Sequence, residues 1–177
     1  MAEHAKLTGV ERFFDENDII VSKTDLKGRL TYANKVFLDV AGYTEQECLG
    51  KQHSLIRHPE MPRCIFKLLW DTIHSGSEIF AYVINRCKNG DHYWVYAHVT
   101  PSRNASGDYI GYHSNRRVPD RKIIDDAIIP LYRDLKAEEE RYSNRKDGLN
   151  SSETMVTAFL SQQGIAYDEF IATVGQT

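Results

Sequence analysis

Apolar and polar positions along the chain form strand-like runs at both ends of its middle region. A β-branched run, the turn residues Asp25 to Gly28 and a second β-branched run predict a hairpin near the start. Further along, Asn89-Gly90 joins two more runs and is the strongest short-range hairpin signal. Five strands are therefore expected. They are residues 19–24, 30–33, 79–84, 93–99 and 109–114.

Helical spacing replaces the strand pattern between the second and third runs. Asn34 stands at a helix N-cap position, and Thr44 with Glu47 matches the capping box that begins a second short helix. The longest amphipathic helix begins near Pro62 and ends before Gly76. This order of elements predicts an α+β domain, in which a five-stranded antiparallel sheet has its helices gathered on one face. Such a fold leaves a pocket between the sheet and the helices.

Three regions follow from these patterns. They are a cap segment at residues 1–17, the mixed domain at 18–119 and a helical C-terminal extension at 120–177. Within the extension, four apolar residues at helical spacing predict a seam that either pairs with a second chain or packs on the sheet. The seam residues are Ile124, Ile128, Leu131 and Leu135.

Helix breakers are expected to divide the extension. Pro130 interrupts the seam, and because a proline inside a helix kinks or ends it, a continuous coiled coil is not expected. Gly148 is expected to break the helical stretch that follows. A further helix would then begin at Ser151 or Ser152.

Composition narrows the class of protein. Of 177 residues, 41% are hydrophobic and 27% are charged, as in an ordinary globular protein. The net charge of −3 and the lack of a basic run argue against nucleic acid as a partner. No window approaches the roughly 20 apolar residues of a membrane helix, and no signal-peptide pattern follows Met1. The expected compartment is therefore the cytoplasm, with no membrane insertion.

Neither a metal site nor an enzyme motif can be recognised. The cysteines Cys48, Cys64 and Cys87 are widely spaced, form no C-x-x-C pair and are expected to be reduced residues of the core. No Walker, Rossmann, G-x-S-x-G or H-E-x-x-H pattern occurs. Catalytic turnover is therefore not expected.

Three motifs in the mixed domain carry a family resemblance. Residues 25–34 read Asp-Leu-Lys-Gly-Arg-Leu-Thr-Tyr-Ala-Asn, and residues 56–62 read Ile-Arg-His-Pro-Glu-Met-Pro. Residues 85–95 read Asn-Arg-Cys-Lys-Asn-Gly-Asp-His-Tyr-Trp-Val. With these motifs, residues 19–119 resemble the PAS superfamily and, within it, the flavin-binding PAS domains of bacterial aerotaxis receptors.

The resemblance implies FAD bound without a covalent link between sheet and helices, with FMN as the alternative flavin. The redox state of the flavin would control signalling to a partner such as a chemotaxis receptor or a kinase, and a homodimer is expected. The chain departs from the family at Glu60, where Asp is usual. A membrane anchor, a linker module and a methyl-accepting coiled coil are missing, so a complete chain of this length would have to signal through another protein.

The resemblance also assigns cofactor contacts to the segment around Arg57. The planar, charged fork of Arg57 suits a phosphate or a flavin carbonyl, and His58 beside it donates or accepts hydrogen bonds. Glu60 belongs to the same motif. Without a ligand, Arg57 would instead pin this loop through a salt bridge to Glu60.

Six other positions complete the expected pocket, and one of them is also a candidate helix cap. Asn34 and Asn85 are expected on opposite sides, where their amides can read the polar edge of an isoalloxazine ring. Asn34 is equally explained as a helix N-cap. Trp70 and Trp94 are candidates to stack on a flat cofactor or to fill the core. Further candidates for the pocket lining are His53 and Tyr93.

Three alternatives remain beside the flavin sensor. A heme would need an axial histidine from His74, His92, His98 or His113, but no heme-specific motif accompanies them. A light-driven flavin–cysteine adduct is disfavoured, because residues 54–57 read Ser-Leu-Ile-Arg and contain no cysteine. The alternative from another class is a cofactor-free PAS module for dimerisation or docking.

Overall fold

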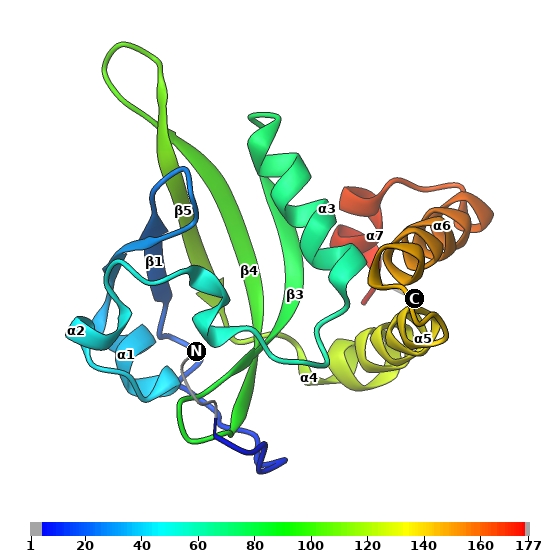
Figure 1. The fold of residues 1–177 in the computed structure, drawn as a ribbon, viewed down its shortest axis with the longest axis horizontal. Coiled ribbons are helices and arrows are strands. Elements are labelled where there is room, and N and C mark those ends of the chain that lie inside the picture. Colours follow the sequence, from blue (N-terminus) through cyan, green and yellow to red (C-terminus); the bar gives the residue numbers. More distant parts are fainter. Residues whose placement is uncertain (1–4, 176–177) are drawn as a thin grey trace.

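A five-stranded antiparallel sheet forms the centre of the computed structural model, which describes residues 5–175 (Figure 1). The strands lie in the order β2-β1-β5-β4-β3, so that β2 and β3 form the two edges. The predicted α+β class and all five predicted strands are confirmed. The strands are β1 Ile20–Thr24, β2 Leu30–Ala33, β3 Ile79–Arg86, β4 His92–Arg103 and β5 Tyr109–Arg117.

Helices lie on one face of this sheet and beside one of its edges. Four helical segments connect β2 to β3, and the longest of them, α3, packs against β3 and β4. The extension follows β5 and lies beside β3 (Figure 1). The first group is α1 Lys35–Ala41, α2 Glu45–Cys48, η1 His53–Ile56 and α3 Arg63–His74. The extension is α4 Arg121–Ile123, the π-helical η2 Ile124–Ile128, α5 Ile129–Glu140, α6 Arg145–Gln163 and α7 Tyr167–Thr173.

Local sequence signals account for the short helices. The side chain of Asn34 accepts a hydrogen bond from the Phe37 N–H and caps α1, while Thr44 and Glu47 form the predicted capping box of α2. The predicted starts of both helices are confirmed. For α3 the Pro62 N-cap position supplies no capping side chain, so the free N–H groups of its first turn need acceptors from elsewhere.

The apolar seam of the extension packs within its own chain. Ile124, Ile128 and Leu135 are completely buried, and Tyr132 between them donates a hydrogen bond of 2.6 Å to the carbonyl of Tyr82 on β3. Of the two alternatives for the seam, the structure therefore shows packing on the sheet. The extension covers the edge strand β3, which would otherwise expose unpaired backbone groups.

The irregularity expected at Pro130 is present, whereas the break expected at Gly148 is not. Pro130 stands in the first turn of α5, and the π-helical η2 comes just before it. Gly148 does not break a helix, because α6 begins after Asn144 and runs through it, so the helix start expected at Ser151 or Ser152 was wrong. A Cβ on Gly148 would lie 2.3 Å from the carbonyl oxygen of Glu139. Glycine is therefore needed for the close crossing of α5 and α6.

The N-terminal segment is tied to the turn between β3 and β4. Thr8 donates a hydrogen bond of 2.6 Å to Asp91, and Arg12 forms an ion pair of 2.9 Å with the same carboxylate. The first four residues of the expected cap segment lie outside the described residues. Within residues 5–175, no helix has both the length and the apolar character needed to cross a membrane.

Candidate functional site

A mostly apolar cavity lies between α3, the loop before it and the inner face of the sheet. Counted with its open mouth, it holds about 660 Å³. The cavity volume that remains between the side chains is only about 50 Å³. A flat three-ring group would therefore need side chains at the mouth to move. The apolar walls are Ile56, Met61, Phe66, Leu69, Ile73, Val83, Ile84, Ala97 and Val99.

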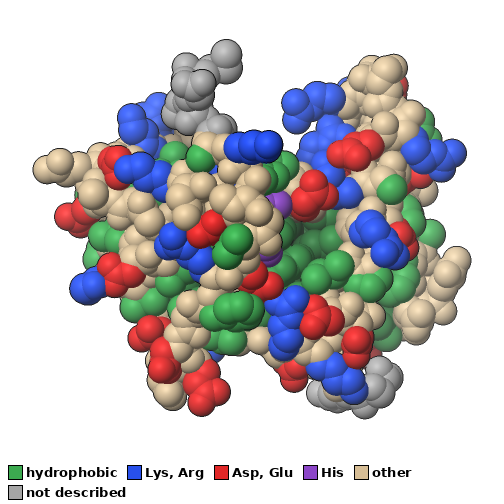
Figure 2. Space-filling view, turned by 90° about the horizontal axis from the view of Figure 1, so that it is seen from below, with side chains coloured by type: hydrophobic (Ala, Val, Ile, Leu, Met, Phe, Trp, Pro, Cys, Tyr) green, Lys and Arg blue, Asp and Glu red, His purple; other side chains and the backbone are tan. Residues whose placement is uncertain are grey.

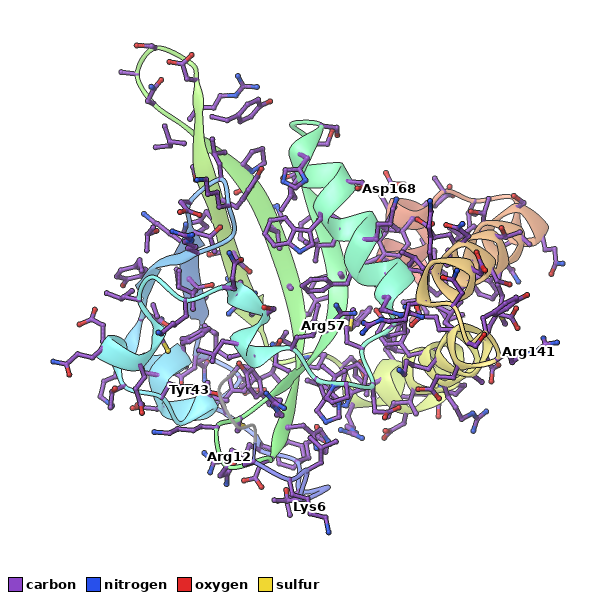
Figure 3. All side chains as sticks on the ribbon, viewed as in Figure 1. Lys6, Arg12, Tyr43, Arg57, Arg141 and Asp168 are labelled. Atoms are coloured by element: carbon purple, nitrogen blue, oxygen red, sulfur yellow. The ribbon has the colours of Figure 1, made fainter. Side chains whose placement is uncertain are left out.

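Four residues that the sequence nominated line this cavity, namely His53, Arg57, Trp70 and Asn85. The backbones of Arg57 and Asn85 pair as an isolated antiparallel bridge, which ties the loop before α3 to β3. Arg57 lies near the middle of the molecule (Figure 3). Its guanidinium stacks 4.4 Å from the centre of the Phe66 ring and donates to the Met61 carbonyl. The alternative salt bridge to Glu60 does not form.

Asn34 does not line the cavity. Its side-chain oxygen accepts hydrogen bonds of 3.0 Å from the N–H groups of Val21 and Phe37. Its amide nitrogen donates to the carbonyl of Ile19 at 2.7 Å. These bonds occupy the side chain in joining β1 to α1, so the structure supports the capping role of Asn34 rather than a ligand contact.

Four other nominated residues also lie outside the cavity lining. Trp94 faces the extension, with its ring 6.0 Å from that of Tyr132. Tyr93 is fully buried in the core, and burial raises the pKa of its hydroxyl. His58 lines a separate groove, and Glu60 is exposed at the surface.

Three strands each place on the cavity lining a residue that has a buried polar atom without a partner. The atoms are Thr24 Oγ1 on β1, Asn85 Nδ2 on β3 and Arg116 Nη1 on β5, and none has a hydrogen-bond partner among the described residues. A buried polar group left unsatisfied costs about 1 to 3 kcal/mol, and most native proteins carry few of them. Three such atoms on one cavity wall point to a ligand with a polar edge.

Arg116 is the site residue that the sequence analysis missed. It is only 2% exposed, and it donates hydrogen bonds to Ser22 and, at 2.9 Å, to His53 Nε2. The signal that could have found it is the alternation of β5, which turns Tyr112, Ser114 and Arg116 to the same face. The expected strand ended at Ser114, two residues before Arg116.

The polar end of the cavity has a positive character. Burial lowers the pKa of His53 to about 3, and the positive charge of Arg116 adds to this effect. His53 is therefore neutral near pH 7, and its Nε2 accepts the hydrogen bond from the guanidinium. Burial also lowers the pKa values of Arg57 and Arg116 from their ordinary value, but arginine stays charged in proteins.

Aromatic rings form the wall on the α3 side. Trp70 meets Phe66 and Tyr112 edge to face, with ring centres 6.2 Å and 5.6 Å away. The ring of His74 lies 5.5 Å from the Trp70 ring. Since Trp70 and His74 also line a surface pocket beside the start of η1, this cluster separates the cavity from solvent.

A second depression, here called the basic groove, continues from the cavity at Arg57. The loop before α3, the end of β3, α5 and the start of α6 form its walls. In Figure 2, a hollow near the middle of the face has hydrophobic and histidine side chains inside it and charged side chains around it. The charged or titratable residues of the groove are Arg57, His58, Arg63, Arg86, Lys136, Glu139, Glu140 and Arg145.

Cysteines and histidines bear on the alternative cofactors. Cys48, Cys64 and Cys87 are free and buried, and burial raises the pKa of each thiol to about 11. No cysteine lines the cavity, nor do the four histidines considered for heme. Within residues 5–175, no three His, Cys, Asp or Glu side chains come together as a metal site.

Comparison with known proteins identifies the domain. The profile of the PAS fold matches residues 30–115. The aerotaxis receptor of Escherichia coli (strain K12) is 40% identical over 138 residues, covering 77% of this chain and 27% of the receptor. A nitrogen fixation regulatory protein of Klebsiella pneumoniae is 27% identical over 103 residues, 58% of this chain and 21% of that protein. The chain thus spans about a quarter of the length of these relatives.

Solved structures agree with the fold. A light-oxygen-voltage domain studied with a flavin analogue has a TM-score of 0.54 at 19% identity and covers 66% of this chain and 87% of its own. A PAS domain from Colwellia psychrerythraea has a TM-score of 0.52 at 17% identity, covering 57% and 86%. These structures show the fold alone. The family profile and the 40% identical relative show that the chain contains a PAS domain of the aerotaxis-receptor type.

Proposed function

We propose that the chain is the sensory module of a signalling protein, that its cavity holds the isoalloxazine ring of FAD, and that it reports redox or oxygen status to a partner. The observation that carries this proposal is the set of unpartnered polar atoms on Thr24, Asn85 and Arg116, in a cavity with otherwise apolar walls. An isoalloxazine ring has an apolar end and an edge of carbonyl oxygens and ring nitrogens. The aerotaxis-receptor relative and the flavin-analogue domain support a flavin.

The chain's own residues would hold and shield such a ring. Asn85 and Arg116 would donate hydrogen bonds to its polar edge, and Thr24 would donate or accept one. Trp70 would cover the ring and exclude water. When bound, the flavin would supply reversible uptake of electrons.

The basic groove favours FAD over FMN within this proposal. Arg57 lines both the cavity and the groove, so a chain of two phosphates leaving the ring would pass it and meet the other cations. Lys136 and Arg145 of the extension belong to that groove. The extension would then contribute to the cofactor site, and ligand state would affect its contacts with the PAS domain.

A route from the cavity to a partner follows β3. Asn85 faces the cavity on this strand, whereas the Tyr82 carbonyl accepts the hydrogen bond from Tyr132 of the extension. A changed hydrogen bond at Asn85 would therefore act on the element that carries the extension. The partner would read the altered surface of the sheet or of the extension.

A cofactor-free interaction module is the second candidate, and the small open volume of the cavity favours it. Titration of the flavin-free chain with FAD, FMN and riboflavin separates the two. We expect FAD to bind at least tenfold more tightly than riboflavin, and Lys136→Gln to weaken FAD while leaving riboflavin unchanged. Lys122→Gln on α4, outside the groove, is the matched control. Failure of all three flavins to bind would favour the interaction module.

A further inference from the structure

Arg116 is a permanent charge inside the cavity wall without a compensating negative charge. Its hydrogen-bond partners, Ser22 and neutral His53, carry no charge. The ring of Phe37 lies 5.5 Å from the guanidinium. Among the described residues, no carboxylate forms an ion pair with Arg116, and Nη1 has no hydrogen-bond partner.

A second arginine of the chain, in contrast, has a carboxylate partner. At the start of α3, Arg63 is also largely buried, and there a fully buried carboxylate on Glu139 pairs with it at 2.9 Å. A buried charge is costly unless a partner and hydrogen bonds satisfy it. The cost of Arg116 therefore falls when negative charge enters the cavity beside Nη1.

We propose that Arg116 recognises charge in this cavity and selects a planar ring whose edge carries, or acquires, negative charge. Asn85 and Thr24, which flank the same space, would fix which edge of the ring faces the guanidinium. His53 is a positioning residue, because its Nε2 holds the guanidinium in place. This inference rests on the proposed function and adds a preference between two states of the same ligand.

For a flavin, the preference has a definite direction. A reductant that donates two electrons, with one proton from water, would convert the neutral oxidised ring into an anion. Because Arg116 interacts more strongly with the anion, it binds the reduced ring more tightly than the oxidised ring. By linkage, Arg116 raises the reduction potential of the bound flavin, and a tenfold preference corresponds to about 30 mV for a two-electron couple.

The test compares Arg116→Met, which removes the charge at similar length, with Arg116→Lys, which keeps it. Arg117→Met, the exposed neighbour on β5, is the matched control. Two quantities are measured: the urea midpoint of the flavin-free chain, and the midpoint potential of the FAD-loaded chain during titration with dithionite against a reference dye.

For Arg116→Met we expect a urea midpoint at or above that of the wild type, because an unpaired charge is lost. We also expect its potential to fall by at least 30 mV, a tenfold loss of preference for the reduced ring. Arg116→Lys should keep more than half of that preference, and Arg117→Met should change neither quantity.

Two results would overturn the inference in distinguishable ways. If FAD binds but Arg116→Met leaves the potential unchanged and lowers the urea midpoint, Arg116 is a structural residue and only this inference fails. If the wild-type chain binds FAD in neither redox state, the proposed function fails, and the inference fails with it.

Discussion

The cavity and the contact between α3 and the extension each contain a largely buried arginine. They differ in how many of the polar groups around that arginine have hydrogen-bond partners. This contact, called here the Glu139 junction, consists of Arg63, Cys64, Glu139, Gly148 and Ser152. In it, Glu139 accepts hydrogen bonds from Arg63 Nε at 2.9 Å, from the Cys64 N–H at 3.0 Å and from Ser152 Oγ at 3.2 Å.

This difference indicates that the junction stabilises the fold, whereas the cavity serves to bind a ligand. The carboxylate of Glu139 supplies the cap that α3 lacks in its own sequence, and its negative charge suits the positive end of the helix. Both carboxylate oxygens of Glu139 therefore accept hydrogen bonds in the folded chain. In the cavity, by contrast, Thr24, Asn85 and Arg116 keep donors and acceptors unused. Substitutions should therefore reduce stability at the junction and ligand binding in the cavity.

The largest expected effect is at the junction. Glu139→Ala should lower the free energy of unfolding by about 3 to 5 kcal/mol, because removing one partner of a buried pair leaves the other charge uncompensated. Thermal unfolding monitored by circular dichroism measures the loss. Asp39→Ala, which breaks the exposed Lys35–Asp39 pair, is the control and should change stability little. Equal losses of stability for Glu139→Ala and Asp39→Ala would contradict a stabilising role specific to the junction.

A smaller effect is expected where α5 and α6 cross. Gly148→Ala places a methyl group where Glu139 O lies 2.3 Å away, and such overpacking costs about 1 to 3 kcal/mol. Without this contact, the substitution would stabilise the helix by about 1 kcal/mol. Ser161→Ala on the exposed side of the same helix is the control. A gain in thermal stability for Gly148→Ala would show that α5 and α6 leave room for a methyl group where they cross.

A fall in pH should lower the stability of the folded chain, because the buried His53 is held in its neutral form. Its folded pKa of about 3 lies below its ordinary value of 6.5, so between these pH values the unfolded chain binds a proton that the folded chain does not. Stability is therefore complete above pH 6.5 and falls by about 1.4 kcal/mol per pH unit as the pH drops further. Urea unfolding between pH 7 and pH 4.5 should show a shallower fall for His53→Gln. Parallel curves would exclude His53 as the cause.

The smallest change in stability is expected for two asparagines. Their substitutions should differ in which property they change, stability or flavin affinity. Asn34→Ala should cost about 1 kcal/mol of stability, because it removes the cap of α1, and should leave flavin affinity nearly unchanged. Asn85→Ala should do the reverse, weakening FAD binding at least tenfold with little loss of stability in the flavin-free chain. Urea unfolding and flavin titration of both variants measure this. The same profile for both would contradict the assignment of Asn85 to the ligand.

Local signals in the sequence predicted most of the fold. The five strands, the Asn34 cap and the Thr44 capping box depend on residues close together in the chain, and all are present. Gly148 was misread because its role is a contact with Glu139 on another helix. A glycine that ends a helix and a glycine that admits a neighbouring helix look the same in one sequence.

The candidate site was predicted in part for a similar reason. His53, Arg57, Trp70 and Asn85 were nominated and line the cavity. Trp94 lies on the opposite face from Asn85's cavity wall and packs on Tyr132, a contact that depends on where the extension folds back. A residue's type gave its chemistry, but the face it occupies depends on strand register and on distant packing.

Whether the cavity holds a flavin can be read from the colour and the released cofactor of the purified chain. Its visible absorption spectrum is recorded, and the small molecule released by heat is identified by its mass. We expect a yellow protein that releases FAD in a ratio approaching one per chain. A colourless chain that stays colourless after incubation with excess FAD would contradict the proposed flavin site.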